Sequence, residues 1–97
     1  MQQAASSERG HKPKPIKVKV TFPLAGKEHY KSEDPPDTQV EQVRVAAMAH
    51  FGVADDDSAV YYLTHGRKRP DPTETIGAIA DGEDSVKFSL VKELIQG

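Results

Sequence analysis

Two segments, one near each end of the chain, alternate between apolar and polar side chains with a period of two residues. The first runs from Ile16 to Phe22 and the second from Val86 to Leu90. A period of two is typical of a β-strand that buries one face and exposes the other. Together the two segments predict a sheet with one apolar face, and that face needs a cover.

One amphipathic helix is available to cover it. Thr38 is followed by Glu41 at the spacing of a capping box, so we expect the helix to begin at Gln39. Gly52 stands where a left-handed residue would end the helix, and Val53 is expected to make an apolar contact beyond that cap. At about 100° per residue, four apolar side chains fall within one stripe: Val40, Val43, Ala47 and Phe51.

Weaker signals complete the order of strand, strand, helix, strand and strand. After a glycine-containing turn at residues 24–27, residues 28–31 are expected to return as a short second strand with Tyr30 facing inward. The continuous apolar run of residues 59–63 favours a strand in the middle of the sheet. A turn at residues 64–68 and an irregular stretch then lead to the final strand.

One curved mixed sheet gripping one helix accounts for this order. The predicted fold class is therefore α+β, a β-grasp with a mixed sheet of four to five strands. A chain of 97 residues has room for one small core. We expect a disordered tail at residues 1–15, a folded domain at 16–93 and a short tail at 94–97, because residues 1–15 are too polar to offset chain entropy.

Composition argues against several functional classes. The formal net charge is −2 with acids and bases intermixed, which predicts no nucleic-acid-binding face. The absence of cysteine excludes disulfides and a cysteine nucleophile, and the four dispersed histidines fit no nucleophile, zinc or phosphate-loop motif. No segment reaches the length of a membrane span or a secretory signal. We expect a cytoplasmic, monomeric protein that is not an enzyme and needs no cofactor or metal.

Charged clusters permit two interpretations each. Asp55–Asp57 could attract calcium but lacks the glycine and distal glutamate of a calcium loop, which favours a charged loop before a strand. Arg67–Arg69 could attract an acidic partner surface or form a solvated turn. Lysines are spread along the chain, where they could accept a further modifier or serve solubility.

The last residue is Gly97. A glycine has no Cβ to clash with the walls of a narrow channel, so it can present its carboxylate to a nucleophile there. The alternative is a domain that happens to stop at glycine.

Taken in order, these features resemble ubiquitin over residues 16–97. The matching features are the opening alternating strand, Pro36-Asp37-Thr38 at the helix start with Val40 and Val43, the turn at Gly66–Lys68, and Thr75-Ile76 before the last strand. The likeness is to a divergent bacterial ubiquitin-like protein. It implies an activating enzyme, a conjugating enzyme, a metal-dependent isopeptidase and target proteins as partners.

The resemblance implies a protein modifier whose Gly97 is activated and conjugated to target amines. Its tail would consist of Leu94, Ile95 and Gln96. Ubiquitin ends in two glycines preceded by arginine, whereas a single glycine follows Gln96 here. Two other functions stay open: a β-grasp module that binds partners noncovalently through its sheet, and a sulfur carrier, which shares the adenylation step but has a different final acceptor.

The resemblance also implies an apolar partner-binding patch near Leu24, Val91 and one of Tyr61 and Tyr62. Neighbouring residues of a strand point to opposite faces, so one of the two tyrosines should face outward. A shift of one residue in register would exchange them.

Overall fold

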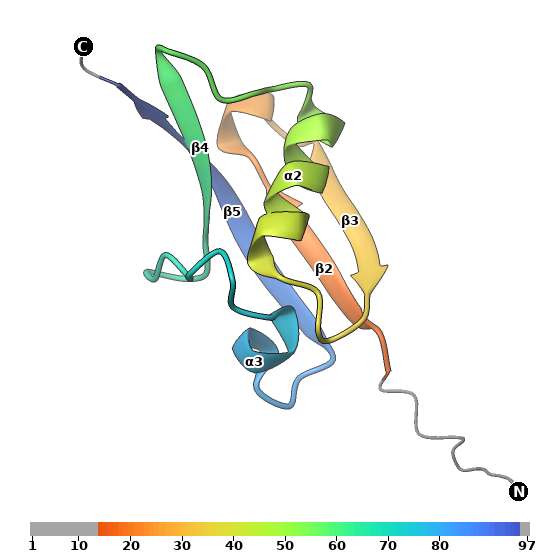
Figure 1. The fold of residues 1–97 in the computed structure, drawn as a ribbon. Helices are drawn as coiled ribbons and strands as arrows, with labels where there is room; N and C mark the ends of the chain where they lie inside the picture. The colour runs from red at the N-terminus through yellow and green to blue at the C-terminus, as the bar shows by residue number, and fades with distance from the viewer. Residues whose placement is uncertain (1–13, 96–97) are drawn as a thin grey trace, which may run out of the picture.

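The structure is a computed structural model in which residues 14–95 are described. The elements of this part, in chain order (Figure 1), are β2 (Ile16–Thr21), the 3-10 turn η1 (Pro23–Ala25), β3 (His29–Asp34), α2 (Val40–Phe51), β4 (Ala59–Thr64), α3 (Ile76–Ala80) and β5 (Ser85–Leu94). Most of the tail predicted at residues 1–15 lies outside the described residues.

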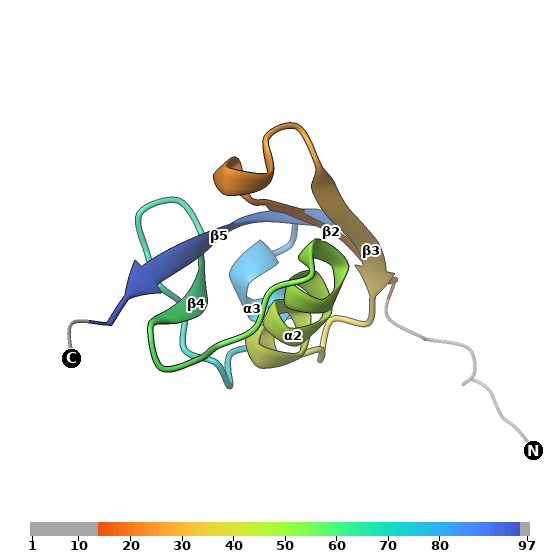
Figure 2. The same cartoon turned by 90° about the horizontal axis from the view of Figure 1, so that it is seen from above.

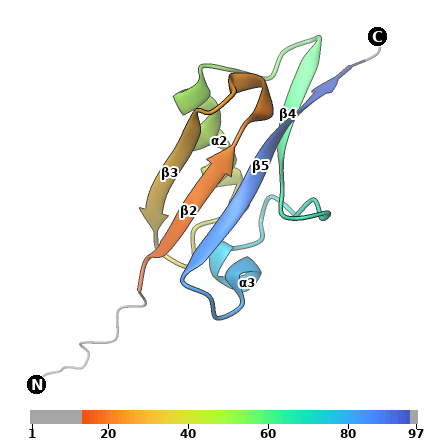
Figure 3. The same cartoon turned by 180° about the vertical axis from the view of Figure 1, so that it is seen from behind.

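The described strands form one mixed sheet in the order β3-β2-β5-β4. The central strands β2 and β5 are parallel, and each has an antiparallel partner on its other side, β3 and β4 respectively. Both α-helices lie on one face of this curved sheet (Figure 2), and the opposite face carries no α-helix of the described chain (Figure 3). The predicted α+β β-grasp fold is confirmed.

The core lies between the sheet and the helices and is entirely apolar in the described part of the chain. The alternation predicted for the first and last strands is confirmed, since every second residue is buried from Ile16 to Val20 in β2 and from Val86 to Leu90 in β5. Ile76 of α3 is also fully buried, so the short helix closes one end of the core.

The start of α2 differs from the prediction by one residue. Gln39 is the N-cap, and the capping box joins Gln39 to Gln42 instead of Thr38 to Glu41. Residues 72–76 cause the shift, because they run alongside the chain just before the helix. Ile76 N donates to Thr38 O at 2.8 Å, and Gln39 pairs with Thr75 in an isolated bridge, which keeps this stretch extended.

The end of α2 matches the prediction. Gly52 adopts the left-handed conformation (φ 72°, ψ 33°), and the backbone N–H of Val53 reaches back to Met48 O at 3.0 Å. Val53 packs against the core beyond the cap. The predicted stripe is buried at Val40, Val43 and Ala47, with Phe51 at its margin; Met48 is buried as well and was not predicted.

Strand β4 was predicted in the middle of the sheet and that prediction is wrong, because β4 is an edge strand beside β5. A continuous apolar run indicates burial of both faces of a strand, and it carries no information on how many strands flank it. Here only Ala59 and Leu63 are fully buried, while the residues between them are half-buried.

Strand β5 is longer than expected, so the tail does not begin at residue 94. Leu94 pairs with Ala59 of β4, and Ile95 N donates to Ser58 O at 2.9 Å. Leu94 therefore belongs to the sheet and not to the tail predicted at residues 94–97. Gln96 and Gly97 lie outside the described residues.

Candidate interaction surface

The two tyrosines of β4 point to opposite faces of the sheet, and the register shows which faces outward. Tyr62 lies opposite Val91, next to the buried pair Leu63 and Leu90. Because neighbouring residues alternate between faces, Tyr62 and Val91 share the outer face of the sheet. Tyr61 is on the helix side, where its ring meets Phe22 edge-on at 6.1 Å.

An arginine covers the ring of the outward tyrosine. The Cζ atom of Arg69 lies 3.9 Å from the centroid of the Tyr62 ring, close enough for a cation–π interaction. Arg69 Nη1 also lies 3.9 Å from Glu93 Oε1, which makes a loose ion pair between two largely exposed side chains. The sequence singled out Arg69 only as part of a basic turn, because nothing in the chain order shows that this turn folds back over Tyr62.

Exposed apolar side chains of η1 and of the end of β5 lie at one end of the sheet. Leu24 is 70% exposed on η1. Strand β2 ends opposite Ser89, two residues before Val91, so η1 and Val91 lie at the same end of the sheet (Figure 3). Leu94 and Ile95 continue β5 beyond that end with exposures of 66% and 45%. The predicted patch residues other than Tyr61 therefore lie at one end of the sheet, with Tyr62 and Val91 on its outer face and Leu24 exposed beside them.

The free edge of β4 is held by side chains from α2 and the acidic loop. The backbone N–H of Tyr61 donates to Asp55 Oδ1 at 2.8 Å, and Tyr61 O accepts from Arg44 Nη1 at 3.1 Å. The same Nη1 reaches Asp55 Oδ2 at 3.0 Å, while the other guanidinium nitrogens bind the two oxygens of Glu41 at 2.8 Å. This network satisfies the backbone N–H and C=O of Tyr61 on the edge of β4 that has no neighbouring strand in the described sheet.

The network also shifts the acid–base behaviour of its members. Hydrogen bonds from Arg44 hold the pKa of Glu41 below its usual value, and those to Glu41 and Asp55 raise the pKa of Arg44. In the same loop, the hydroxyl and backbone N–H of Ser58 lower the pKa of Asp56. The acidic loop is therefore explained by backbone and arginine contacts.

Replacing Arg44 with methionine should destabilise the domain by about 1–2 kcal/mol. Hydrogen bonds to charged groups are worth more than neutral ones, but solvent screens the exposed acids, which lowers the estimate. Urea denaturation followed by circular dichroism measures the change. Arg67→Met is the matched control, since Arg67 is exposed in a turn and should change stability by less than about 0.5 kcal/mol. Equal stability of the two variants would contradict a structural role for Arg44.

The histidines and acids of the described residues form no site of their own. No group of three metal-ligating side chains comes together between residues 14 and 95. His50 Nε2 lies 2.7 Å from Glu28 Oε2, and its ring packs against Tyr30 and Phe51, which is a structural role. No described helix is both long and apolar enough to cross a membrane.

Comparisons with known proteins agree with this geometry. The family model described as BilA ubiquitin-like domain 2 matches residues 17–93. A solved structure of Caldiarchaeum subterraneum ubiquitin is 24% identical with a TM-score of 0.67, over 86% of this chain and 99% of that one. A structure described as "Molecular Mimicry of SUMO promotes DNA repair" is 17% identical with a TM-score of 0.63, over 84% and 96%. No curated protein matches the chain significantly.

Proposed function

Because the chain belongs to the family of BilA ubiquitin-like domain 2, we propose that it is a ubiquitin-like modifier, with Gly97 as the residue that is joined to target amines. A partner activating enzyme transfers AMP from ATP to the Gly97 carboxylate and releases pyrophosphate. A partner cysteine then displaces AMP to form a thioester, and a target amine displaces that thiol to form an amide. The thiol comes from a partner, since this chain has no cysteine.

The observation that carries this proposal is the way β5 leaves the domain. Its last pair is Leu94 with Ala59, and the side chains of Leu94 and of the next residue, Ile95, are exposed. Only Gln96 separates Ile95 from Gly97, so Gly97 is two residue steps from Ile95, a reach of roughly 7 Å when extended. An enzyme that reacts with the Gly97 carboxylate therefore has to contact Leu94 and Ile95 as well.

In this proposal the outer surface supplies recognition. Tyr62, Val91 and Leu24 form the docking area for the activating enzyme, the conjugating enzyme and an isopeptidase. A large aromatic ring on a rigid strand is a suitable anchor for a partner. The chain itself then acts as the substrate of these enzymes, in the cytoplasm and as a monomer.

Intact-mass analysis tests the proposed function. The purified chain is incubated with lysate of its source, with and without ATP, and covalent adducts to proteins are expected only with ATP. A thiocarboxylate in place of protein adducts would identify a sulfur carrier. The absence of any adduct in a lysate shown to contain the cognate enzymes would overturn the proposal.

A noncovalent interaction module is the second candidate, and it is favoured by the outer face itself. Tyr62 lies beside Val91, and the guanidinium of Arg69 lies over its ring. Together these side chains offer a surface that could bind a partner protein without any covalent step. This candidate predicts partner binding that does not depend on ATP or on Gly97.

The modifier function predicts that Tyr62→Ala weakens binding to the activating enzyme roughly tenfold, because central aromatic anchors typically contribute this much. Titration calorimetry with the purified activating enzyme measures the affinity. Val45→Ala is the control, since Val45 is 54% exposed on α2, away from the outer face. Wild-type affinity in the Tyr62 variant would place the interface elsewhere.

A further inference from the structure

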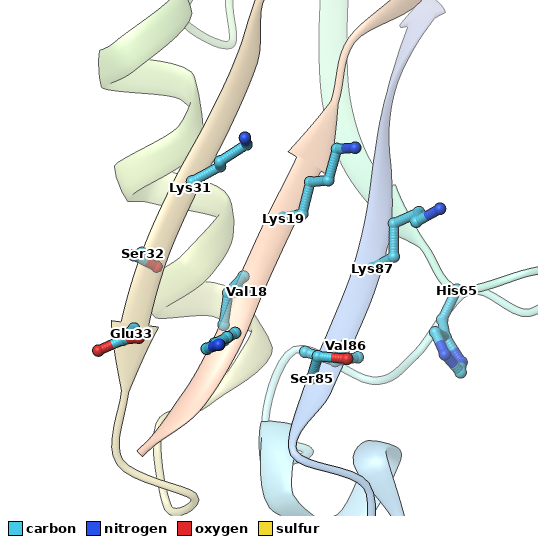
Figure 4. Close-up of a pocket in the computed structure, with 10 residues that line it drawn as sticks. Val18, Lys19, Lys31, Ser32, Glu33, His65, Ser85, Val86 and Lys87 are labelled. Carbon is cyan, nitrogen blue, oxygen red and sulfur yellow. The ribbon is translucent and has the colours of Figure 1, made fainter.

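Three lysines stand abreast on the outer face of the sheet. In the strand register, Lys19 of β2 lies opposite Lys31 of β3 on one side and opposite Lys87 of β5 on the other. Their neighbours Val18 and Phe88 are buried, so the lysine side chains project from the face without helices. Figure 4 shows the three side chains next to one another. We call Lys31, Lys19 and Lys87 the lysine row.

The lysine row lies in a shallow groove of about 780 Å³. Lys17, Glu33 and His65 line the same groove. Lys17 lies opposite Glu33 in the register, so the carboxylate of Glu33 faces a different lysine. Within residues 14–95, none of the salt bridges involves a member of the lysine row. The described chain therefore leaves the charge of the row unneutralised.

Such a row is electrostatically unfavourable in the isolated domain. Adjacent strands are about 4.8 Å apart, and like charges directly opposite one another destabilise a sheet. Lys19 is repelled from both sides, and it is also half-buried, which limits its ability to move away. A bound anion would replace this repulsion with attraction to three cations at once.

We propose that the lysine row binds a short acidic segment of a partner protein. The row spans two strand spacings, about 10 Å, and every second side chain of an extended peptide points to the same side, at intervals of about 7 Å. Three carboxylates at alternate positions, on flexible side chains, can therefore each meet one ammonium group. The open groove leaves room for the peptide backbone to lie across the strands.

The surroundings of the groove favour a short segment over a long polyanion. At one end, Lys17 N donates to Asp84 O, which places the acidic loop of residues 81–84 beside the groove. Glu33 adds a further carboxylate to the groove itself. A nucleic acid strand would have to pass these charges, and the lining offers no phenylalanine, tyrosine or tryptophan ring on which bases could stack.

This binding site is separate from conjugation. It involves neither ATP nor Gly97, and it is centred on β2, whereas Tyr62 lies on the edge strand β4. The proposal therefore stands or falls independently of the proposed modifier function.

Fluorescence anisotropy with a labelled hexaglutamate peptide tests the site on the full chain at low ionic strength. Replacing the row with glutamine (Lys19→Gln, Lys31→Gln and Lys87→Gln together) should weaken binding roughly tenfold or more, because three ion pairs are lost. Changing Lys27, Lys68 and Lys92 to glutamine gives a control of the same net charge, and it should bind within about twofold of wild type. Hexaglutamine should not bind.

The row variant should melt no lower than wild type, because the substitutions relieve repulsion. If it fails to fold, the single variant Lys19→Gln gives the same test with a loss of roughly threefold expected. Equal losses in the row and control variants, or no saturable binding to wild type, overturn the proposal. So does tighter binding of an oligothymidylate than of hexaglutamate, or self-association in sedimentation that the row variant abolishes, since the occupant would then be a nucleic acid or a second copy.

Discussion

Deletion of Gly97 is expected to abolish every ATP-dependent covalent adduct of the chain while leaving the domain folded. In the proposed function the reacting group is the Gly97 carboxylate. Removing the residue moves the carboxylate to Gln96, whose side chain has to enter the same narrow channel. Folding should not change, because the fully buried core residues lie between Ile16 and Leu90. Intact-mass analysis after incubation with lysate and ATP measures the adducts.

Gln96→Ala is the matched control for this deletion. It shortens the side chain next to the reacting residue and keeps the carboxylate on Gly97, so adducts should still form. Conjugates that persist without Gly97 would show that the attachment point is elsewhere. Loss of conjugates in the control as well would show that the enzymes read the residue before the glycine.

Local patterns carried most of the information on the fold. The alternation in β2 and β5 and the stripe of α2 follow from side-chain geometry alone, so the sequence predicted the faces they bury. The capping prediction failed by one residue because contacts from residues 72–76, distant in sequence, extended the chain before Val40. Local capping signals do not contain that information.

The candidate surface was less predictable because it depends on which strands are neighbours. Tyr62 and Val91 could be placed as candidates, but only the β4–β5 register separates Tyr62 from Tyr61. In the same way, Lys19 and Lys87 are far apart in the chain, and the sheet brings them together. The alternation in the sequence already indicated that Lys19 and Lys87 point outward. Their position opposite each other follows only from the parallel pairing of β2 with β5.

One close approach could not be predicted at all, and it joins α3 to the turn before α2. Gly77 lies within the five-residue helix α3, and its backbone N–H donates to Pro36 O at 2.8 Å. A Cβ added at Gly77 would stand 2.8 Å from both Cβ and O of Pro36. Real Cβ atoms essentially never come this close to other atoms, and the proline backbone cannot rotate away.

Gly77→Ala is therefore expected to destabilise the domain by about 2–3 kcal/mol, as overpacking of a tight contact does. In a domain of this size that corresponds to a fall in melting temperature of roughly 10–20 °C. Thermal denaturation followed by circular dichroism measures it. The neighbouring Ile76 is fully buried, so a shift of α3 that relieves the clash would also disturb the core.

Gly66→Ala is the control. It separates the effect of the steric clash at Pro36 from the effect of losing glycine's backbone freedom. Gly66 has a positive φ of 63° and open space around the added Cβ, so it tests strain without a clash. Its cost should be about 1–2 kcal/mol, the penalty of an alanine in the left-handed region. If Gly77→Ala is no more destabilising than Gly66→Ala, then α3 can move away from Pro36 freely. In that case the packing of α3 against Pro36, in the turn before α2, contributes little to the stability of the domain that carries the candidate surface.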